Sequence, residues 1–371
     1  MLDDAAPRIE ARRELPEDVL RAMHAAELFR LTLPGELGGA EIEPRRLAQV
    51  TETIAMGDAS AAWCLGQASG CAMSAAFLDV SAAARVFGPA DAVLAWGAGA
   101  VGKATAATGG YRISGRWGFA SGGKHATWLG AHCKVYEADG SPRLDAQGKH
   151  VERTAVLPRA QAAIADDWYV MGLKGTRSEG YQVDDLFVDD ALTLNRDDPA
   201  ECRLSAPLYR FSTTMVYAAC FSGVAMGIAR AMLDDLIALA LHKTPRGANP
   251  MRESQAVQIR LAELEAQLSS ARAFQQEALA EAWAEVLDKG VLLLDRRVRI
   301  RLATTYAINQ ATEVTEEVYR LAGATAIFES RPFERRFRDA HAVSQQVQGR
   351  FTNFETVGRH MLGHDLDMLF L

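Results

Sequence analysis

The sequence predicts an α+β protein in which a β-domain lies between two helical regions. Apolar residues recur three or four positions apart from Pro16 to about Val86, as in amphipathic helices. From Val93 to about Leu194 the chain is rich in glycine, β-branched and aromatic residues, with repeated turn signals. Helical periodicity returns from Ser205. We therefore expect three domains, a helical one over 1–88, a β-domain over 89–200 and a helical bundle over 201–371.

The N-terminal region is expected to be helical with one interruption. The segment 33–44, LPGELGGAEIEP, combines prolines with three glycines, which indicates a loop. Asp79 is a suitable cap for a helix that Gly88-Pro89 would end.

A hairpin and an aromatic strand are predicted in the central region. Gly109-Gly110 is a hairpin turn signal, and Trp117, Phe119 and Ser121 follow at alternate positions. Because a strand points residues i and i+2 to one face, these three side chains are expected to share a face. That face would present flat apolar surface and one hydroxyl, which suits a planar ring with a polar edge. The alternative is an ordinary half-buried strand with an aromatic core face.

The C-terminal region predicts four long helices joined by short connections. Their helical periodicity covers 211–242, 253–288, 291–322 and about 333–362. Short joints between long helices favour an antiparallel bundle.

Composition excludes several classes of function. The 371 residues are 49% hydrophobic and 23% charged, with a net charge of −7, so a nucleic-acid surface is not expected. Five scattered cysteines without a CxxC pair indicate neither a disulfide framework nor a zinc site. The charged N-terminus is unlike a signal peptide, and the apolar runs are too short to span a bilayer. We expect a cytoplasmic enzyme without a membrane segment or a metal.

Three segments resemble the acyl-CoA dehydrogenase superfamily, especially its flavin-dependent monooxygenase branch. GGYRISGRWGFASG (109–122) and MGLKGTRS (171–178), the latter followed by VDDLFV, resemble the two signatures of its central domain. YRLAGATAIF with ERRFRDAH, within 319–341, resembles its C-terminal bundle. The resemblance covers nearly the whole chain in register. It implies a helical domain, an antiparallel β-barrel-like domain, a four-helix bundle and a bound flavin, FMN or FAD.

A glycine motif in the same region could be mistaken for a dinucleotide site. Gly97, Gly99 and Gly102 spell GxGxxG after a strand-like segment. A Rossmann site needs a helix starting there and an acidic residue about twenty positions later. Gly109-Gly110 ends any helix, and no Asp or Glu occurs between residues 103 and 135. We reject that interpretation. By its place in the family, this segment resembles the loop that lies against the flavin.

The resemblance also implies positions for flavin contacts. Phe119 and Ser121 match an aromatic and a hydroxyl residue beside the ring, with Ser121 near flavin N5, and Trp117 would share their wall. Trp168 resembles a stacking tryptophan, although a core tryptophan is equally consistent with the sequence.

Two groups of residues are candidates for the flavin phosphate and its surroundings. Lys174, Arg177 and Ser178 lie in a turn whose amides and cations could meet a phosphate, although the family usually has glycine at the position of Arg177. Lys243 and Arg246 lie in an inter-helix segment that the family uses to reach the phosphate, often across a subunit interface. A solvated basic loop is the alternative there. Gly323 matches a glycine that approaches the cofactor, commonly from a neighbouring subunit.

The acid–base residues depart from both branches of the family. The dehydrogenase glutamate position falls at Val347, and the histidine usual in the monooxygenases is Gln346. Glutamine can position a group by hydrogen bonds but cannot act as a general base. His341 is the nearest replacement, although a spacing of five does not share a helix face. His360 and His364 are expected to be a surface pair rather than a zinc site.

The function that the resemblance implies is reduced-flavin monooxygenation of a small organic substrate through a C4a-hydroperoxyflavin. A separate flavin reductase would supply the reduced flavin. The first alternative is an acyl-CoA dehydrogenase that oxidises a thioester Cα–Cβ bond with FAD, with an electron-transfer flavoprotein as its partner. A second alternative is an inactive scaffold that binds a ligand or partner. The family also implies a homotetramer.

Overall fold

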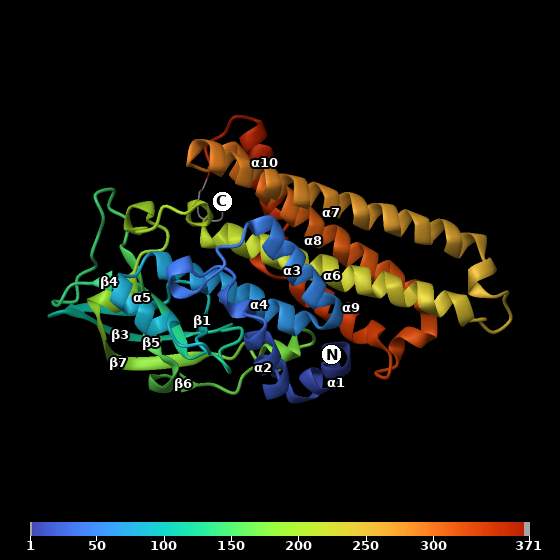
Figure 1. Ribbon diagram of the computed structural model, residues 1–371, viewed down its shortest axis with the longest axis horizontal. Helices are drawn as coiled ribbons and strands as arrows, with labels where there is room; N and C mark the ends of the chain where they lie inside the picture. The colour runs from blue at the N-terminus through green and yellow to red at the C-terminus, as the bar shows by residue number, and fades with distance from the viewer. Residues whose placement is uncertain (1, 367–371) are drawn as a thin grey trace.

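A computed structural model describes residues 2–366 of the chain, and it has helical layers on one side of a single sheet and a long bundle beyond them (Figure 1). Of the first helices, the one over Ala59–Ala72 packs between the sheet and the bundle. Asp79 caps the last of them by accepting a hydrogen bond from the backbone N–H of Ala82. The N-terminal helices are α1 (Leu2–Arg12), α2 (Glu17–Ala25), α3 (Pro44–Gly57), α4 (Ala59–Ala72) and α5 (Val80–Phe87).

The central sheet has eight strands among the described residues, and it is mixed rather than antiparallel. Strand β4 (Trp128–Tyr136) pairs in parallel with both β1 (Leu94–Trp96) and β2 (Gly102–Ala107), so the expectation of an antiparallel domain is wrong for these two ladders. The other ladders are antiparallel, including the predicted β2–β3 hairpin, in which Gly109 has a φ of +79°. The strands are β1 (Leu94–Trp96), β2 (Gly102–Ala107), β3 (Gly110–Trp117), β4 (Trp128–Tyr136), β5 (Glu152–Pro158), β6 (Ala163–Ile164), β7 (Tyr181–Asp189) and β8 (Thr193–Leu194). Their order is β6-β7-β3-β2-β4-β5-β8, and β1 lies off this path, paired with β4.

The GxGxxG segment opens no helix. Gly97 and Gly99 lie in the loop after β1, and Gly102 begins β2. The rejection of a Rossmann site is therefore confirmed, since no helix N-terminus is available there for a pyrophosphate.

The bundle is built from long helices and ends in two shorter ones. The expected helix over 333–362 is wrong, because Gln346 is extended and starts a short turn there. A Cβ on Gly349 would lie 2.6 Å from the Ser344 carbonyl oxygen, so the chain turns back tightly after α9. The bundle helices are α6 (Thr213–His242), α7 (Gln255–Lys289), α8 (Leu294–Ala322), α9 (Pro332–Ser344) and α10 (Thr352–Met361).

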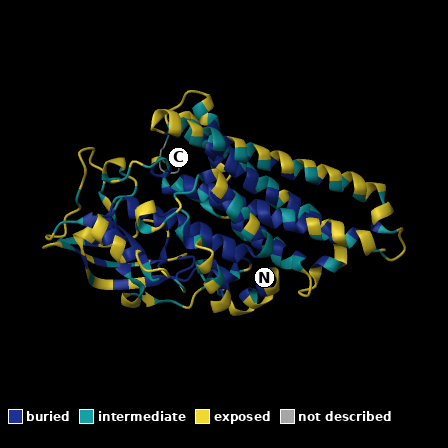
Figure 2. Ribbon diagram, viewed as in Figure 1, coloured by how far each residue is buried: buried dark blue, intermediate teal, exposed yellow. Residues whose placement is uncertain are grey.

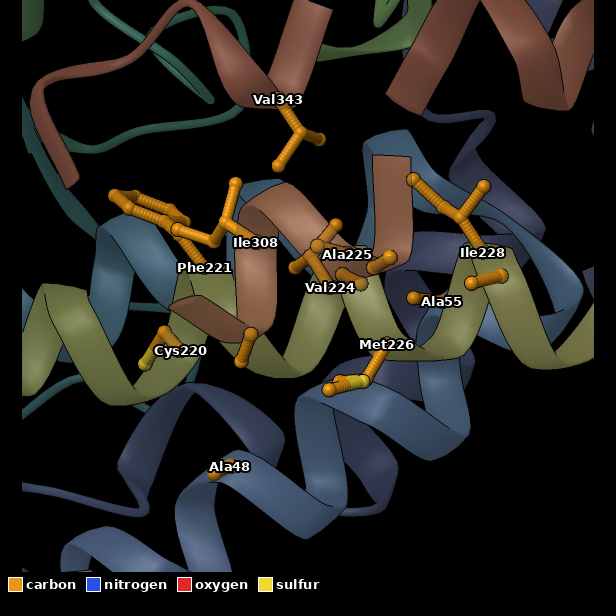
Figure 3. Close-up of a cluster of buried hydrophobic side chains, with 14 of the residues drawn as sticks. Ala48, Ala55, Cys220, Phe221, Val224, Ala225, Met226, Ile228, Ile308 and Val343 are labelled. Atoms are coloured by element: carbon orange, nitrogen blue, oxygen red, sulfur yellow. The ribbon is translucent and has the colours of Figure 1, made fainter. Parts of the chain in front are cut away.

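Helix α6 is the central element of the bundle, and close packing against α3 fixes its position. A Cβ on Gly223 would lie 2.4 Å from the Ala48 carbonyl oxygen, so only glycine permits this approach. In Figure 3, Cys220 and Met226 lie on the side of α6 toward Ala48, whereas Phe221 lies beside Ile308 of α8. Figure 2 shows the buried interior along these helices and the exposed outer face of α7.

None of the helices within residues 2–366 is both long and apolar enough to cross a membrane. The domain limits predicted at 88 and 200 fall, respectively, after α5 and in the connection between β8 and α6.

Candidate active site

A cavity of about 990 Å³ opens where the sheet, α4, α6 and α9 meet. Its size is at the upper end for small-molecule and cofactor sites. Aromatic side chains from six separate parts of the chain dominate its lining, namely Trp63, Trp96, Phe119, Trp168, Tyr217, Phe221 and Phe337.

One side of the cavity is a stack of three aromatic rings from α4 and α6. Trp63 stacks on Phe221 with ring centroids 4.0 Å apart, and Tyr217 stacks on the same ring at 5.3 Å. A Cβ on Gly70 would lie 2.1 Å from the Tyr217 ring, so the glycine leaves room for the stack. The result is a rigid flat surface.

Three buried hydroxyls, Ser121, Ser178 and Thr176, form a continuous hydrogen-bonded chain at the cavity wall, referred to below as the hydroxyl chain. Ser121 Oγ is 2.6 Å from Ser178 Oγ, which is 2.7 Å from Thr176 Oγ1. Thr176 Oγ1 donates to the Leu173 carbonyl oxygen at 2.8 Å. At the other end, Trp63 Nε1 donates to Ser121 Oγ at 3.0 Å. All three hydroxyl residues line the cavity.

Helix α9 holds the loop that contains Leu173, whose carbonyl oxygen ends the hydroxyl chain. Asp339 accepts a hydrogen bond from the Leu173 N–H at 2.6 Å, and Arg338 donates to the Met171 carbonyl oxygen. A Cβ on Gly172 would lie 2.2 Å from the Arg338 carbonyl oxygen, so helix and loop are in direct contact. Burial raises the pKa of Asp339 to about 7. The Arg338-Asp339 pair therefore positions the loop and has no direct place in the cavity lining.

A second polar group gathers around Trp96 and is called the polar recess below; it consists of Gln67, His132, Arg196 and Tyr217. The Arg196 guanidinium lies 4.9 Å from the Trp96 ring centroid, and the His132 ring lies 5.0 Å from it, edge to face. Gln67 Nε2 donates to the Tyr217 hydroxyl at 3.0 Å. All four residues of the recess line the cavity.

His132 is the most buried group of the recess. Its Nδ1 lies 2.7 Å from Thr154 Oγ1, whereas its buried Nε2 has no hydrogen-bond partner among the described residues. Burial, together with the charge of Arg196, lowers the pKa of His132 well below its usual value. The imidazole is therefore neutral near pH 7, with one ring nitrogen available to a ligand.

The structure changes the expected place of Trp117. Strand β3 ends at Trp117, and Phe119 has a φ of +63°, so the alternation of faces stops before Phe119. Trp117 is fully buried; it stacks on Tyr181 and donates to the His132 carbonyl oxygen at 2.9 Å. The prediction that it shares a wall with Phe119 and Ser121 is therefore wrong.

Phe119 and Trp168 form a corner at the cavity mouth. Their rings are 5.9 Å apart and nearly perpendicular, and Phe119 is 69% exposed. Trp168 is half-buried and donates through Nε1 to the Leu173 carbonyl oxygen at 3.3 Å, so it is not a core tryptophan.

The cations predicted beside the phosphate are not in the cavity lining. Lys174 pairs with Glu10 of α1 at 2.8 Å, and Arg177 pairs with Glu14 at 2.7 Å and with Glu179 at 2.8 Å. Because these carboxylates already neutralise both cations, the turn serves to fasten α1. The expected role of this turn beside the flavin phosphate stays a prediction. Ser178 of the same turn does line the cavity.

Lys243, Arg246 and Gly323 lie at the opposite end of α6 from the cavity. Lys243 Nζ donates to the Ala322 carbonyl oxygen at 2.6 Å and to Thr325 Oγ1 at 2.9 Å, and Arg246 is exposed. Phe221 is the last residue of α6 in the cavity lining, and the helix continues to His242, so this end is about 30 Å from the cavity. A single chain therefore does not bring these residues to the cavity.

His341 and Gln346 both reach the cavity, even though their spacing does not share a helix face. Helix α9 ends at Ser344, and the turn that follows brings Gln346 to the same wall. The His341 ring packs on Phe337 at 4.4 Å, with Nε2 3.5 Å from Glu316 Oε1. Gln346 Oε1 accepts a hydrogen bond from the Gln348 N–H at 2.7 Å.

Several lining residues were not identified from the sequence, in particular Trp63, Gln67, His132, Arg196 and Tyr217. Helix α4 has a nearly uniform apolar pattern, so Trp63 and Gln67 resembled residues of the hydrophobic core. The one available signal was a glutamine inside an otherwise apolar, small-residue helix.

Comparison with known proteins gives matches along nearly the whole chain. The acyl-CoA dehydrogenase N-terminal domain profile matches residues 1–83, and the C-terminal domain profile matches residues 219–349. Indole-3-acetate monooxygenase of Pseudomonas putida is 31% identical over 356 residues, covering 95% of this chain and 89% of that protein. The oxygenase component of the FADH(2)-dependent resorcinol hydroxylase of a Rhizobium species is 27% identical, covering 97% and 90%.

A solved structure has the same fold. XiaF from a Streptomyces species, in complex with FADH2 and glycerol, superposes with a TM-score of 0.91 at 23% identity. The match covers all of this chain and 94% of that one.

Proposed function

Because this chain belongs to the acyl-CoA dehydrogenase family and is a flavin-dependent monooxygenase of that fold, we propose that it oxygenates a small aromatic substrate that carries an acidic group. The predictions of family, fold class, flavin dependence and oxidoreductase activity are confirmed by these relatives. The substrate, the roles of single residues and the assembly are our proposals.

The observation that carries the proposal is the absence of carboxylates from the cavity wall. Among the described lining residues there is no aspartate or glutamate, whereas there are seven aromatic residues and two arginines. Removal of an α-proton from an acyl thioester needs a general base at the reacting carbon. The wall provides surface for aromatic rings instead. This favours oxygenation over dehydrogenation.

The residues at the cavity wall fit a flavin. The hydroxyl chain offers a polar edge, and the corner of Phe119 and Trp168 offers flat surfaces beside it. The Gly97–Gly99 loop lets backbone approach a ring closely. We propose that these groups hold the isoalloxazine, with Ser121 facing N5. Reduced flavin, when bound, supplies the electrons that activate dioxygen.

The polar recess is proposed to bind the acidic group of the substrate. The ion partner of Arg196 within the described chain is exposed Asp197, at 3.8 Å, which leaves the guanidinium fork available for a carboxylate. His132 Nε2 and the Gln67 amide add hydrogen-bonding groups at the same place. Indole-3-acetate, which the relative from P. putida is named for, is an aromatic acid of this kind.

Two further polar residues of the cavity wall, His341 and Gln346, are proposed to have different roles. His341 is the titratable group of α9 in the cavity lining, so we propose that it moves the substrate proton. Gln346 cannot titrate, and its role is to orient a bound group by hydrogen bonds.

Two partners are proposed as well. Relatives named as oxygenase components support a separate reductase that supplies reduced flavin. The place of Lys243, Arg246 and Gly323, remote from the cavity of their own chain, supports a homotetramer in which they approach the cofactor of a neighbour. Light scattering tests this, and a flavin-bound monomer would contradict it.

The function is tested by supplying reduced flavin and dioxygen to the pure protein with matched aromatic compounds. We expect hydroxylation of an arylacetic acid and at least tenfold weaker binding of its neutral amide. The difference should shrink in Arg196→Gln and persist in Arg203→Gln, a change of an arginine outside the cavity lining. Anaerobic bleaching of the flavin by an acyl-CoA thioester would instead support the dehydrogenase reaction. A pure protein that binds neither reduced nor oxidised flavin would leave only the scaffold alternative.

A further inference from the structure

The direction of every hydrogen bond in the hydroxyl chain is fixed by its end at a carbonyl. The Leu173 carbonyl oxygen can only accept, so Thr176 uses its single proton there. Ser178 must then donate to Thr176, which leaves Ser121 as the donor to Ser178. No other assignment satisfies all three contacts, because each hydroxyl has one proton.

Ser121 is therefore an acceptor toward the cavity. Ser121 donates its single proton to Ser178 Oγ, and one of its two lone pairs accepts a hydrogen bond from the Trp63 N–H. The other lone pair remains, on a residue that is 6% exposed and lines the cavity. A group that meets Ser121 Oγ from the cavity must be a hydrogen-bond donor.

The two redox states of a flavin differ at this point. Reduced flavin carries a hydrogen on N5 and donates, whereas oxidised flavin has only a lone pair there. We propose that the hydroxyl chain makes this site select reduced over oxidised flavin, with Ser178 and Thr176 as positioning residues that hold Ser121 in its accepting orientation. This rests on the proposed function, in which Ser121 faces N5.

Such selection suits an oxygenase that receives its flavin from another protein. The cavity would take up reduced flavin and release oxidised flavin after turnover. A lone pair opposed to a lone pair in a buried place loses a hydrogen bond and leaves both groups unsatisfied. Anchoring of Leu173 by Asp339 keeps the carbonyl in place, so helix α9 contributes to the same selection.

The test measures binding of both redox states by anaerobic calorimetry, with the flavin that the pure protein binds more tightly, FMN or FAD. In Ser178→Ala the Ser121 proton is released, so Ser121 can turn and donate to oxidised N5. The ratio of the oxidised to the reduced dissociation constant should fall about threefold to tenfold. Thr176→Val removes the anchor and should lower the ratio as well.

Two variants serve as controls. Thr176→Ser keeps the hydroxyl and should keep the wild-type ratio. Ser69→Ala removes a buried hydroxyl of α4 that donates to the Leu65 carbonyl oxygen and is not in the cavity lining, so it should also leave the ratio unchanged.

A flavin analogue tests the same selection in the wild-type protein. In oxidised 5-deazaflavin a C–H group replaces N5, so the opposed lone pair is gone. Wild-type protein should bind it more tightly than oxidised flavin, and Ser178→Ala, in which Ser121 can donate to N5, should lose this preference.

If the ratio of the oxidised to the reduced dissociation constant is unchanged in folded Ser178→Ala and Thr176→Val, this inference is overturned. Turnover with reduced flavin would still support the proposed function in that case. Equal binding of oxidised flavin and its 5-deaza analogue by wild type would overturn it too. A protein that binds neither redox state and shows no turnover would overturn both.

Discussion

The two ends of helix α6 differ in what a single chain builds there. At the first end, Tyr217 and Phe221 face a cavity whose hydroxyls, rings and cations all come from the same chain. At the other end, Lys243 and Gly323 meet beside the exposed Arg246, and neither they nor Arg246 are among the described residues of that cavity lining. Figure 1 shows these ends far apart along the bundle.

This difference separates two kinds of family signature. Residues at the cavity end are held by packing and by hydrogen bonds within the chain, so their arrangement follows from one fold. The basic residues at the far end lie outside the cavity of their own chain. They could contact a cofactor only in an assembly in which the cavity of a second copy lies beside them.

The largest effect is expected from Phe221→Ala at the cavity end. The ring is 1% exposed and lies between Trp63 and Tyr217, so its loss leaves a large void. The free energy of unfolding should fall by about 3–5 kcal/mol. Urea denaturation measures this.

The same substitution at the far end serves as its control. Phe328 is 58% exposed, and Phe328→Ala should change the free energy of unfolding by about 0.5 kcal/mol or less. Equal losses in the two variants would contradict the contrast between a packed end and an open end.

Ser121→Ala is expected to have the next largest effect. It leaves the buried Trp63 N–H without its acceptor, at a cost of about 1–3 kcal/mol in stability. Affinity for reduced flavin should fall up to about tenfold, and the lifetime of the oxygen-reactive state should change. Stopped-flow absorbance and flavin titration measure these quantities. If flavin affinity, spectrum and oxygen reactivity all stay as in wild type, the flavin lies elsewhere.

A smaller effect is expected from Arg246→Gln at the far end. The side chain is exposed, so stability should change by about 0.5 kcal/mol or less. If Arg246 reaches the cofactor phosphate of a neighbouring copy, flavin affinity should fall about twofold to fivefold, and less so at high salt. Arg252→Gln, another exposed arginine in the same connection, is the matched control. Equal flavin affinity in both variants would contradict a shared site.

The last prediction concerns the pH dependence of stability in Asp339→Asn. Burial raises the pKa of Asp339 to about 7, so between its unfolded pKa and that value the native protein holds a proton that the unfolded chain releases. The contribution of Asp339 to stability is therefore full at low pH and falls as pH rises through about 7. Asparagine stays neutral and can still accept from the Leu173 N–H.

The measurement is urea denaturation of both proteins from about pH 4 to about pH 8. The free energy of unfolding of the variant, relative to that of the wild type, should increase as pH rises. Asp58, with a pKa raised to about 6, titrates in the same window in both proteins, so its own contribution cancels in the difference between them. A difference independent of pH would show that Asp339 is ionised throughout.

The sequence by itself determined the order of helical and β regions, the hairpin at Gly109 and the rejection of a dinucleotide site. These depend on local periodicity, turn chemistry and the spacing of acidic residues, which neighbouring positions alone settle. Its matched segments also led to the family, and Ser121, Phe119, Trp168 and Ser178 do reach one cavity.

Tertiary structure decided the rest of the candidate site. Trp117 was misplaced because one left-handed residue, Phe119, ends the alternation that a strand would continue. Lys174 and Arg177 are absent from the cavity lining, and they pair with Glu10 of α1 and with Glu14, which follows α1, both far away in sequence. The polar recess joins α4, β4, the segment after β8 and α6, and no local pattern links them. The donor direction of Ser121 depends on a carbonyl 52 positions later, fixed only when the loop folds onto it.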